Sequence, residues 1–219
     1  MAKEMIIWDW NGTLLNDVDM CVECMNVLLE KRKLRPLTRE TYRDVFNFPV
    51  KDYYEKAGFD FSKEDFEVPA KEFMDLYHRL LPETDIFPCA TTVLEYFRKQ
   101  GFRQFIVSAM EHNSLVKTLK MRGILRYFEA VSGIDNIYAG GKTEMAGAFL
   151  ERLGLPSERM IFIGDTLHDR EVAQVLGVDY LLVAAGHQSK KRLLERTNRV
   201  VDRLSDIKNV PGLFDTTVH

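Results

Sequence analysis

The sequence has few of the features that mark a disulfide scaffold, a membrane protein or a nucleic-acid-binding surface. Its 219 residues include three cysteines, which cannot all pair with one another, so no disulfide framework is expected. No stretch approaches the roughly 18 consecutive apolar residues that a membrane-spanning helix needs. The formal charge of −3 argues against nucleic acid and anionic membranes as partners. These absences predict a cytoplasmic globular protein, monomeric or homodimeric, that acts on a small molecule.

Two of the cysteines form a Cys-x-x-Cys pair, which can indicate zinc or redox chemistry. The sequence has no second cysteine or histidine pair at ligand spacing to complete such a site. Cys21, Cys24, Met25 and Leu28 instead follow the i, i+3, i+4, i+7 spacing of one helix face. We therefore expect these cysteines to belong to the apolar stripe of a helix.

Short apolar runs of strand length alternate with segments that have the periodicity of helices. Three of the helical segments end at Gly101, Gly123 and Gly154, as helices with a glycine C-cap do. This alternation predicts a Rossmann-like, three-layer α/β/α core with a parallel sheet. The expected strands are residues 5–8, 102–109, 129–134, 160–165 and 179–186.

One region breaks the alternation, because residues 17–84 contain helical patterns and no convincing strand. Turn signals divide it into segments at 17–33, 36–46, 49–58 and 62–81, the last interrupted by Pro69. We interpret it as a small, all-helical cap domain inserted after the first strand. The core domain would then comprise residues 1–16 and 85–219.

Polar residues follow several of the expected strands, at the edge where open parallel sheets bind ligands. They are Asp9, Ser108, Asp165 and Asp169, together with Lys142 at the start of a helix. Two carboxylates, a hydroxyl and an ammonium group suit chemistry on a phosphate group. The Gly-Lys-Thr at 141–143 is not a Walker A loop, because the position of that motif's first glycine holds Asn136.

At these positions the sequence resembles the haloacid dehalogenase superfamily, and within it the phosphoglycolate-phosphatase-like branch with a helical cap. The resemblance rests on four motifs that occur in the family's order. They are "DWNGTL" at 9–14, "FIVSA" ending with Ser108 and Ala109, "GGKTEM" with Lys142, and "IGDTLHD" with Asp165 and Asp169. The resemblance covers nearly the whole chain.

The resemblance implies Mg²⁺-dependent hydrolysis of a small phosphate monoester. Asp9 would be the nucleophile, forming an aspartyl-phosphate. Asp9, Asp165 and the main-chain carbonyl of Asn11 would hold Mg²⁺, with Asp169 supporting the metal or orienting Lys142. The groups expected to bind the phosphoryl oxygens are Ser108, Lys142, and residues near them in the motifs, namely Gly12, Thr13 and Ala109.

Asn11 departs from the family pattern, because the family's phosphatases have there an aspartate that acts as general acid and base. An amide cannot carry a proton at neutral pH, and loss of such a group typically costs ~10²–10⁴-fold in rate. Four explanations stay open. The chain is a phosphatase that uses His112, His168 or a good leaving group; a different hydrolase of the superfamily; a phosphometabolite-binding or interaction protein; or a protein whose Asn-Gly step deamidates.

The cap is expected to determine the substrate, because the core chemistry is the same for any phosphate ester. Arg43 is predicted to bind a substrate carboxylate or second phosphate. Phe48, Tyr53 and Tyr54 would either limit the substrate's size or pack inside the cap, and Trp10 would narrow the entrance. A small phosphorylated organic acid or sugar is the expected substrate.

Overall fold

The computed structural model describes residues 3–134 and 141–214, and its centre is a six-stranded parallel sheet. The strand order is β3-β2-β1-β4-β5-β6, which places the first strand between the second and the fourth. Met5 of β1 aligns with Arg103 of β2 and with Met160 of β4. The strands are β1 (Met5–Trp8), β2 (Arg103–Glu111), β3 (Ala130–Ile134), β4 (Met160–Gly164), β5 (Asp179–Val183) and β6 (Val200–Val201).

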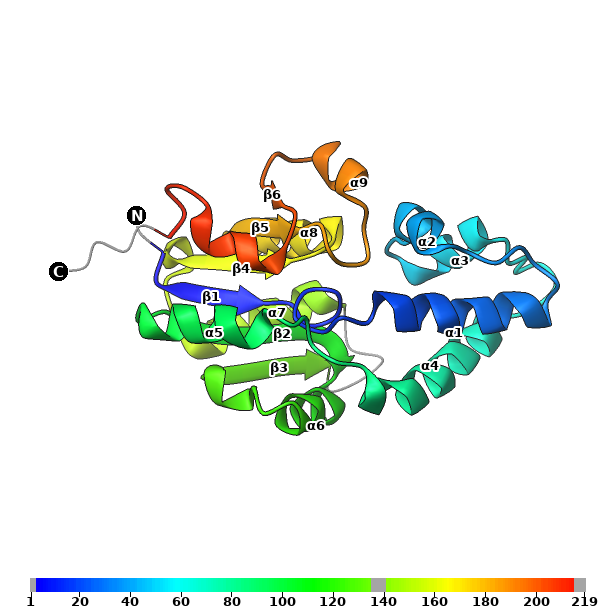
Figure 1. Cartoon of the computed structure of the whole chain (residues 1–219), viewed down its shortest axis with the longest axis horizontal. Coiled ribbons are helices and arrows are strands. Elements are labelled where there is room, and N and C mark those ends of the chain that lie inside the picture. The colour runs from blue at the N-terminus through cyan, green and yellow to red at the C-terminus, as the bar shows by residue number, and fades with distance from the viewer. Residues whose placement is uncertain (1–2, 135–140, 215–219) are drawn as a thin grey trace.

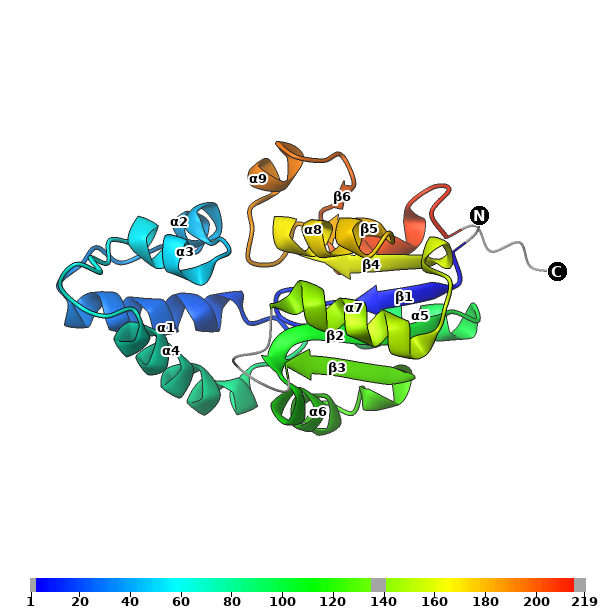
Figure 2. The ribbon, with the colours of Figure 1, turned by 180° about the vertical axis from the view of Figure 1, so that it is seen from behind.

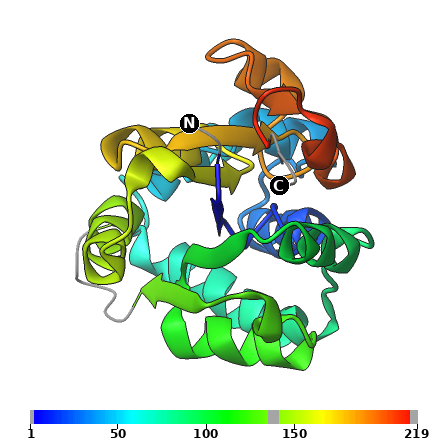
Figure 3. The same cartoon turned by 90° about the vertical axis from the view of Figure 1, so that its left-hand side faces the viewer.

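Helices cover both faces of this sheet, as the alternation along the chain predicts (Figures 1 and 2). Side chains of β1 point alternately to the two faces. Ile6 and Trp8 belong to the apolar cluster that includes helix α5, whereas Met5 and Ile7 belong to the cluster that includes α7 and α8. Figure 3 shows the resulting layers from the end of the sheet. The predicted three-layer α/β/α core is confirmed.

The helices of the core follow the strands in the predicted order. They are α5 (Ala90–Lys99), α6 (His112–Met121), α7 (Lys142–Leu153), α8 (Leu167–Val175) and the short α9 (Lys190–Leu194). Gly154 caps the end of α7 in a left-handed conformation, with φ of 60°. Strand β6 was not expected, because two valines are too short a run for a pattern. Short 3₁₀ helices lie at Leu81–Glu83, Leu125–Tyr127, Ser157–Arg159 and Leu204–Asn209.

Residues 17–84 are helical, with no strand among them, and extend from one end of the sheet (Figure 1). Their helices are α1 (Val18–Lys31), α2 (Arg39–Val45), α3 (Val50–Ala57) and α4 (Glu67–Leu80). Pro69 does not interrupt a helix, contrary to expectation. It is the third residue of α4, in the first turn, where a backbone N–H has no partner within the helix and its loss costs little.

The chain crosses between the sheet and these helices at two adjacent places. The backbone N–H of Asn16 donates to the carbonyl of Asp85 (3.0 Å), and that of Phe87 donates to Leu14 (2.9 Å). A boundary near residues 16 and 85 requires such paired crossings. We therefore propose the division into a core of 1–16 and 85–219 and a cap of 17–84.

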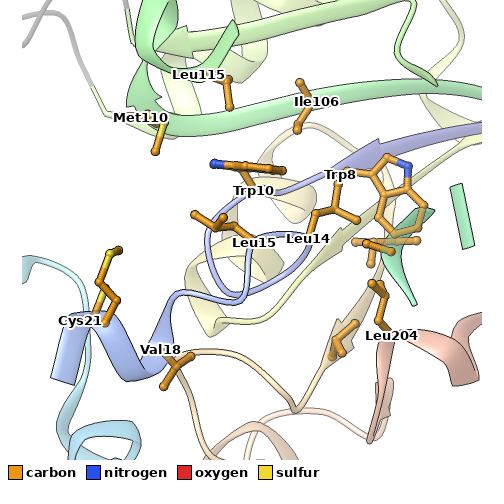
Figure 4. Packing of buried hydrophobic residues seen from close by; sticks show 14 of the residues in the cluster. Trp8, Trp10, Leu14, Leu15, Val18, Cys21, Ile106, Met110, Leu115 and Leu204 are labelled. Atoms are coloured by element: carbon orange, nitrogen blue, oxygen red, sulfur yellow. The ribbon is translucent and has the colours of Figure 1, made fainter. Parts of the chain in front are cut away.

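Two predictions about apolar residues have clear outcomes. Cys21 and Cys24 are buried on α1, as expected for an apolar stripe. Trp10 does not narrow an entrance, because it is fully buried and packs among core residues that include Leu15, Ile106 and Met110 (Figure 4). In the part of the chain described, no helix has the length and apolarity to span a membrane.

Candidate active site

The first motif turns sharply as soon as β1 ends. The N–H of Asp9 still donates to the carbonyl of Ile163 on β4 (2.8 Å), so its carboxylate stands at the carboxyl edge of the sheet. Gly12 has a φ of 70°, and a Cβ there would collide with the carboxylate of Asp165 and the ring of His187. Only glycine lets the turn bring these groups so close together.

Lys142 joins Asp9 to the fourth motif. Its ammonium group forms ion pairs with Oδ1 of Asp9 and with Oδ1 of Asp169, the latter at 2.6 Å. All three side chains are buried. Asp169 also accepts hydrogen bonds at Oδ2 from the hydroxyl and the N–H of Thr166, at 2.7 and 2.9 Å. Asp169 is thus held by its own loop and in turn holds Lys142.

Asp165 completes a cluster of acidic groups, in which carboxylate oxygens of Asp9, Asp165 and Asp169 lie within 4.8 Å of one another. Burial raises the pKa of Asp9, and repulsion from the other two carboxylates raises it further, while Lys142 lowers it. Burial likewise raises the pKa of Asp165. Lys142 and His187 together do not balance the buried carboxylates of Asp9, Asp17, Asp165 and Asp169.

This cluster fits a hard divalent cation. Its donors are carboxylate oxygens, which Mg²⁺ prefers, and a bound dication would offset the unbalanced charge. The hydroxyl of Thr13 bridges Asp9 and Asp165, at 3.3 and 3.2 Å from their oxygens. Asp169 is more fully engaged with Lys142 and Thr166, which favours its orienting role over that of a ligand.

Ser108 lies where the second motif predicts it, on β2 beside the first motif. Its side chain is buried, accepts a hydrogen bond from the N–H of Met110 (3.1 Å) and donates to Oδ1 of Asn11 (3.5 Å). Ala109 follows it on the strand and is exposed. The four motifs therefore meet at one edge of the sheet.

Asn11 is bound to two residues that sequence reasoning did not select. Its Nδ2 donates to Oδ2 of Asp17 (2.7 Å) and to the hydroxyl of Tyr77 (2.6 Å), which projects from α4 of the cap. Asp17 is fully buried and also accepts a hydrogen bond from the N–H of Gly12 (2.8 Å). Tyr77 has no signal in the sequence, because only the folding of α4 against α1 brings it here.

His187 is the third residue that sequence reasoning missed. Its Nε2 lies 3.2 Å from Oδ1 of Asp17, its Nδ1 lies 2.9 Å from the hydroxyl of Tyr42 in the cap, and its backbone N–H donates to Asp165 (2.5 Å). Burial lowers the pKa of His187, but Asp17 outweighs this effect and the pKa is raised to about 9. The feature of the sequence that could have identified His187 is its position shortly after a strand, here β5.

The histidines selected from the sequence lie against other groups. His112 accepts a hydrogen bond from the N–H of Gly133 (3.4 Å). His168 lies 3.4 Å from Glu171, and its ring packs on Phe48, with ring centroids 4.8 Å apart. Neither histidine forms a hydrogen bond with a residue of the acidic cluster among the bonds of the described residues. His187 is the histidine that the fold places at the site.

Arg43 differs from the expectation of a substrate contact, whereas Tyr53 and Tyr54 take the second of their two expected roles. Arg43 holds the cap to the loop after β5. Tyr53 and Tyr54 are buried and pack on other cap rings, so of the two expected roles the packing role describes them. The Nε and Nη2 of Arg43 donate to the carbonyls of Gly186 (2.8 Å), Ala184 (2.6 Å) and Gln188 (3.0 Å).

Comparison with known proteins agrees with this arrangement. The family model of haloacid dehalogenase-like hydrolases matches residues 6–183. The chain belongs to this family. A phosphoglycolate phosphatase of Pseudomonas fluorescens is 24% identical over 222 residues, covering 97% of this chain and 80% of the relative. A probable phosphatase of Dickeya dadantii is 22% identical over 211 residues, covering 94% and 92%.

Solved structures share the fold of this haloacid dehalogenase-like hydrolase. A family member from Streptococcus pneumoniae superposes with a TM-score of 0.80 at 18% identity, covering 94% of this chain and 97% of the other. A predicted phosphatase from Clostridium acetobutylicum gives 0.80 at 18%, covering 95% and 98%. The predicted family and fold are confirmed, and the phosphatase relatives support the predicted enzyme class.

Proposed function

We propose that this hydrolase is a Mg²⁺-dependent phosphatase that cleaves small phosphate monoesters through an aspartyl-phosphate on Asp9. The observation that carries the proposal is the position of the Asp9 carboxylate, at the end of β1 between Lys142 and the carboxylate of Asp165. A carboxylate is a recognised covalent nucleophile in phosphoryl transfer. Burial among like charges gives it a reason to accept a cation and an electrophile.

The roles of the other residues follow from their contacts. Asp9, Asp165 and the main-chain carbonyl of Asn11 would hold Mg²⁺, which when bound reduces the repulsion between a carboxylate and an anionic phosphate. Lys142 and Ser108 would bind phosphoryl oxygens, with Asp169 holding Lys142 in place. Gly12, Thr13 and Ala109 would line the phosphate. Arg43 is left out, because its donors meet carbonyl groups.

Each half of the reaction balances around Asp9. In the first half an Asp9 oxygen forms a bond to phosphorus while the ester P–O bond breaks, and the leaving oxygen takes up a proton. In the second half water attacks phosphorus, the Asp9–phosphorus bond breaks, and the water's proton is released with phosphate. The Asn11 amide can neither give the first proton nor accept the second. Substrates whose leaving group is stable as an anion should therefore react fastest.

A small phosphorylated organic acid or sugar is the proposed substrate, with phosphoglycolate as the first to test because relatives at 24% and 26% identity carry that activity in their names. Phosphate release is measured with Mg²⁺ and with a chelator, for the wild type, Asp9→Asn and the exposed control Asp19→Asn. Turnover that needs Mg²⁺ and disappears only in Asp9→Asn supports the proposal. Equal turnover by Asp9→Asn contradicts it. If the wild type binds phosphate esters without cleaving them, a binding protein replaces the phosphatase.

A further inference from the structure

The side chain of Asp17 divides its hydrogen bonds between two parts of the molecule. Its Oδ1 accepts from the N–H of Gly12 (2.8 Å) and faces Nε2 of His187 (3.2 Å), both in the core. Its Oδ2 accepts from Nδ2 of Asn11 (2.7 Å) and from the hydroxyl of Tyr77 (3.2 Å). The core thus holds Oδ1 in place, and this leaves Oδ2 to bind Asn11 and the cap residue Tyr77.

This arrangement fixes which way the Asn11 amide points. The NH₂ group has two N–H donors, and they are directed to Asp17 and to the hydroxyl of Tyr77. The hydroxyl of Tyr77 in turn donates to Asp17, which closes a triangle of hydrogen bonds. The remaining group, Oδ1 of Asn11, faces the hydroxyl of Ser108 (3.5 Å). The site therefore receives an acceptor from Asn11 and no donor.

We infer that Asp17 and Tyr77 are positioning residues that hold the Asn11 amide with its oxygen toward the reacting phosphate. The inference rests on the proposed phosphatase function. Asp17 directly precedes α1 and Tyr77 lies on α4, both in the proposed cap, so the amide is fixed only when the cap lies against the core. Asn11 then binds a donor, such as a substrate hydroxyl or the attacking water, through Oδ1.

The same geometry identifies Asn11 and Asp17 as one unit, in which the amide and the carboxylate are exchangeable only together. A carboxylate at position 11 would point an oxygen at Oδ2 of Asp17, across the 2.7 Å that an N–H···O bond now occupies. Two carboxylates at that distance repel each other. An amide at position 17 removes the conflict, because its NH₂ group can donate to the new carboxylate while its oxygen keeps the Gly12 and His187 contacts.

The test is a cycle of four proteins: wild type, Asn11→Asp, Asp17→Asn and the double variant. Turnover is measured on p-nitrophenyl phosphate, whose leaving group needs no proton, and on an alkyl phosphate, whose leaving group does. The double variant Asn16→Asp/Asp19→Asn makes the same exchange on exposed side chains and serves as the control. Thermal unfolding of every protein is recorded beside turnover.

The inference predicts a gain that appears only in the double variant. Its turnover of the alkyl phosphate should rise by ~10²-fold over wild type, because position 11 then carries a group that can protonate the leaving oxygen and take a proton from the attacking water. Turnover of p-nitrophenyl phosphate should rise less, because only the water step gains there. Asn11→Asp alone should show a lower unfolding temperature and no such gain. A single variant that matches the double variant overturns the inference, as does a folded double variant with no selective gain.

Failure of the proposed function has a different signature. If no protein of the cycle cleaves p-nitrophenyl phosphate, the phosphatase proposal fails. The unfolding temperatures alone then decide whether Asn11 and Asp17 act as one unit. Strictly additive changes at positions 11 and 17 then overturn it, and a double variant more stable than the sum of the two single changes predicts supports it. In the active enzyme, Tyr77→Phe provides a second check. It should raise KM or lower kcat in wild type, and no change in either contradicts its positioning role.

Discussion

The acidic cluster and the contact between cap and core are neighbours, yet they are held together in opposite ways. In the cluster, Asp9, Asp165 and Asp169 repel one another, and Lys142 and the neighbouring His187 offset only part of their charge. In the contact, each charged group has its partner, as Asp17 has His187 and Asn11. The first is incomplete without a cation and a phosphate, whereas the second is complete as it stands.

The difference shows which parts of the site can respond to a ligand. A group of unbalanced carboxylates gains from binding a cation, so ligand binding and stability are coupled there. A satisfied network gains nothing from a ligand and instead fixes geometry, here that of the Asn11 amide and the closed cap. Changes to the cluster should therefore act mainly on chemistry, and changes to the contact mainly on stability and substrate choice.

Replacing Lys142 should have the largest effect on activity. Lys142→Met keeps the approximate length of the side chain but removes the ammonium group paired with Asp9 and Asp169. We expect kcat/KM for phosphate esters to fall on the order of 10²–10³-fold. Lys63→Met, at an exposed lysine, is the matched control. Comparable activity in both variants would mean that the cluster does not need its lysine.

The second-largest effect should be on the pH dependence of stability, to which the contact between cap and core and the acidic cluster contribute for different reasons. The pKa of His187 is raised to about 9 by Asp17, and the pKa of Asp17 is lowered by His187 despite its burial. The ion pair therefore contributes fully below the unfolded histidine's pKa of 6.5, and the contribution is lost as pH rises toward about 9. It is also lost in acid, as pH falls through the lowered pKa of Asp17.

The cluster changes in the same direction without metal, for a different reason. The pKa values of Asp9 and Asp165 are raised, so the native state holds protons that the unfolded state has released, and stability falls as pH rises. Chemical unfolding from pH 5 to pH 9 should show a loss of ~2 kcal/mol or more. Saturating Mg²⁺ should remove the part of this loss that comes from the acidic cluster. The variant His187→Gln should remove the part that comes from the ion pair between His187 and Asp17. A flat profile in metal-free protein would contradict both assignments.

Weakening the attachment of the cap should have the smallest effect. Arg43→Lys replaces a planar guanidinium that reaches three carbonyls after β5 with a single ammonium group. We expect the free energy of unfolding to fall by about 1–2 kcal/mol, with kcat for p-nitrophenyl phosphate nearly unchanged. Arg39→Lys, at a more exposed arginine on the same helix, is the control. A marked fall in kcat would contradict this and would instead indicate that Arg43 contacts the substrate.

The acidic cluster could be predicted from the sequence because each of its residues directly follows a strand or lies in the first turn of a helix. The parallel order then brings Asp9, Lys142 and Asp165 to one edge, whatever the details of packing. His187 obeys the same rule, because it directly follows the strand expected at 179–186, but it stands outside the four motifs, and its partner Asp17 is 170 residues away in the sequence. The strand ends earlier, at Val183.

The contact between cap and core could not be predicted in the same way. Tyr77 lies in the interior of a helix, 66 residues from Asn11, and nothing in its local pattern distinguishes it from a packing residue. Arg43 has the sequence context of an exposed helix position, and its carbonyl partners are visible only in the folded chain. Asp17 lies just after the first motif and could have been selected from the sequence, but its role depends on its contacts with Asn11 and Tyr77.

The most direct measurement is the mass of acid-quenched wild-type protein during turnover of p-nitrophenyl phosphate with Mg²⁺, followed by peptide mapping. Because Asn11 cannot activate the water of the second half-reaction, the account predicts a phosphorylated fraction that accumulates, located on the peptide that carries Asp9. The fraction should be absent in Asp9→Asn. Steady turnover with the phosphoryl group on another residue, or in the Asp9→Asn variant, would contradict it.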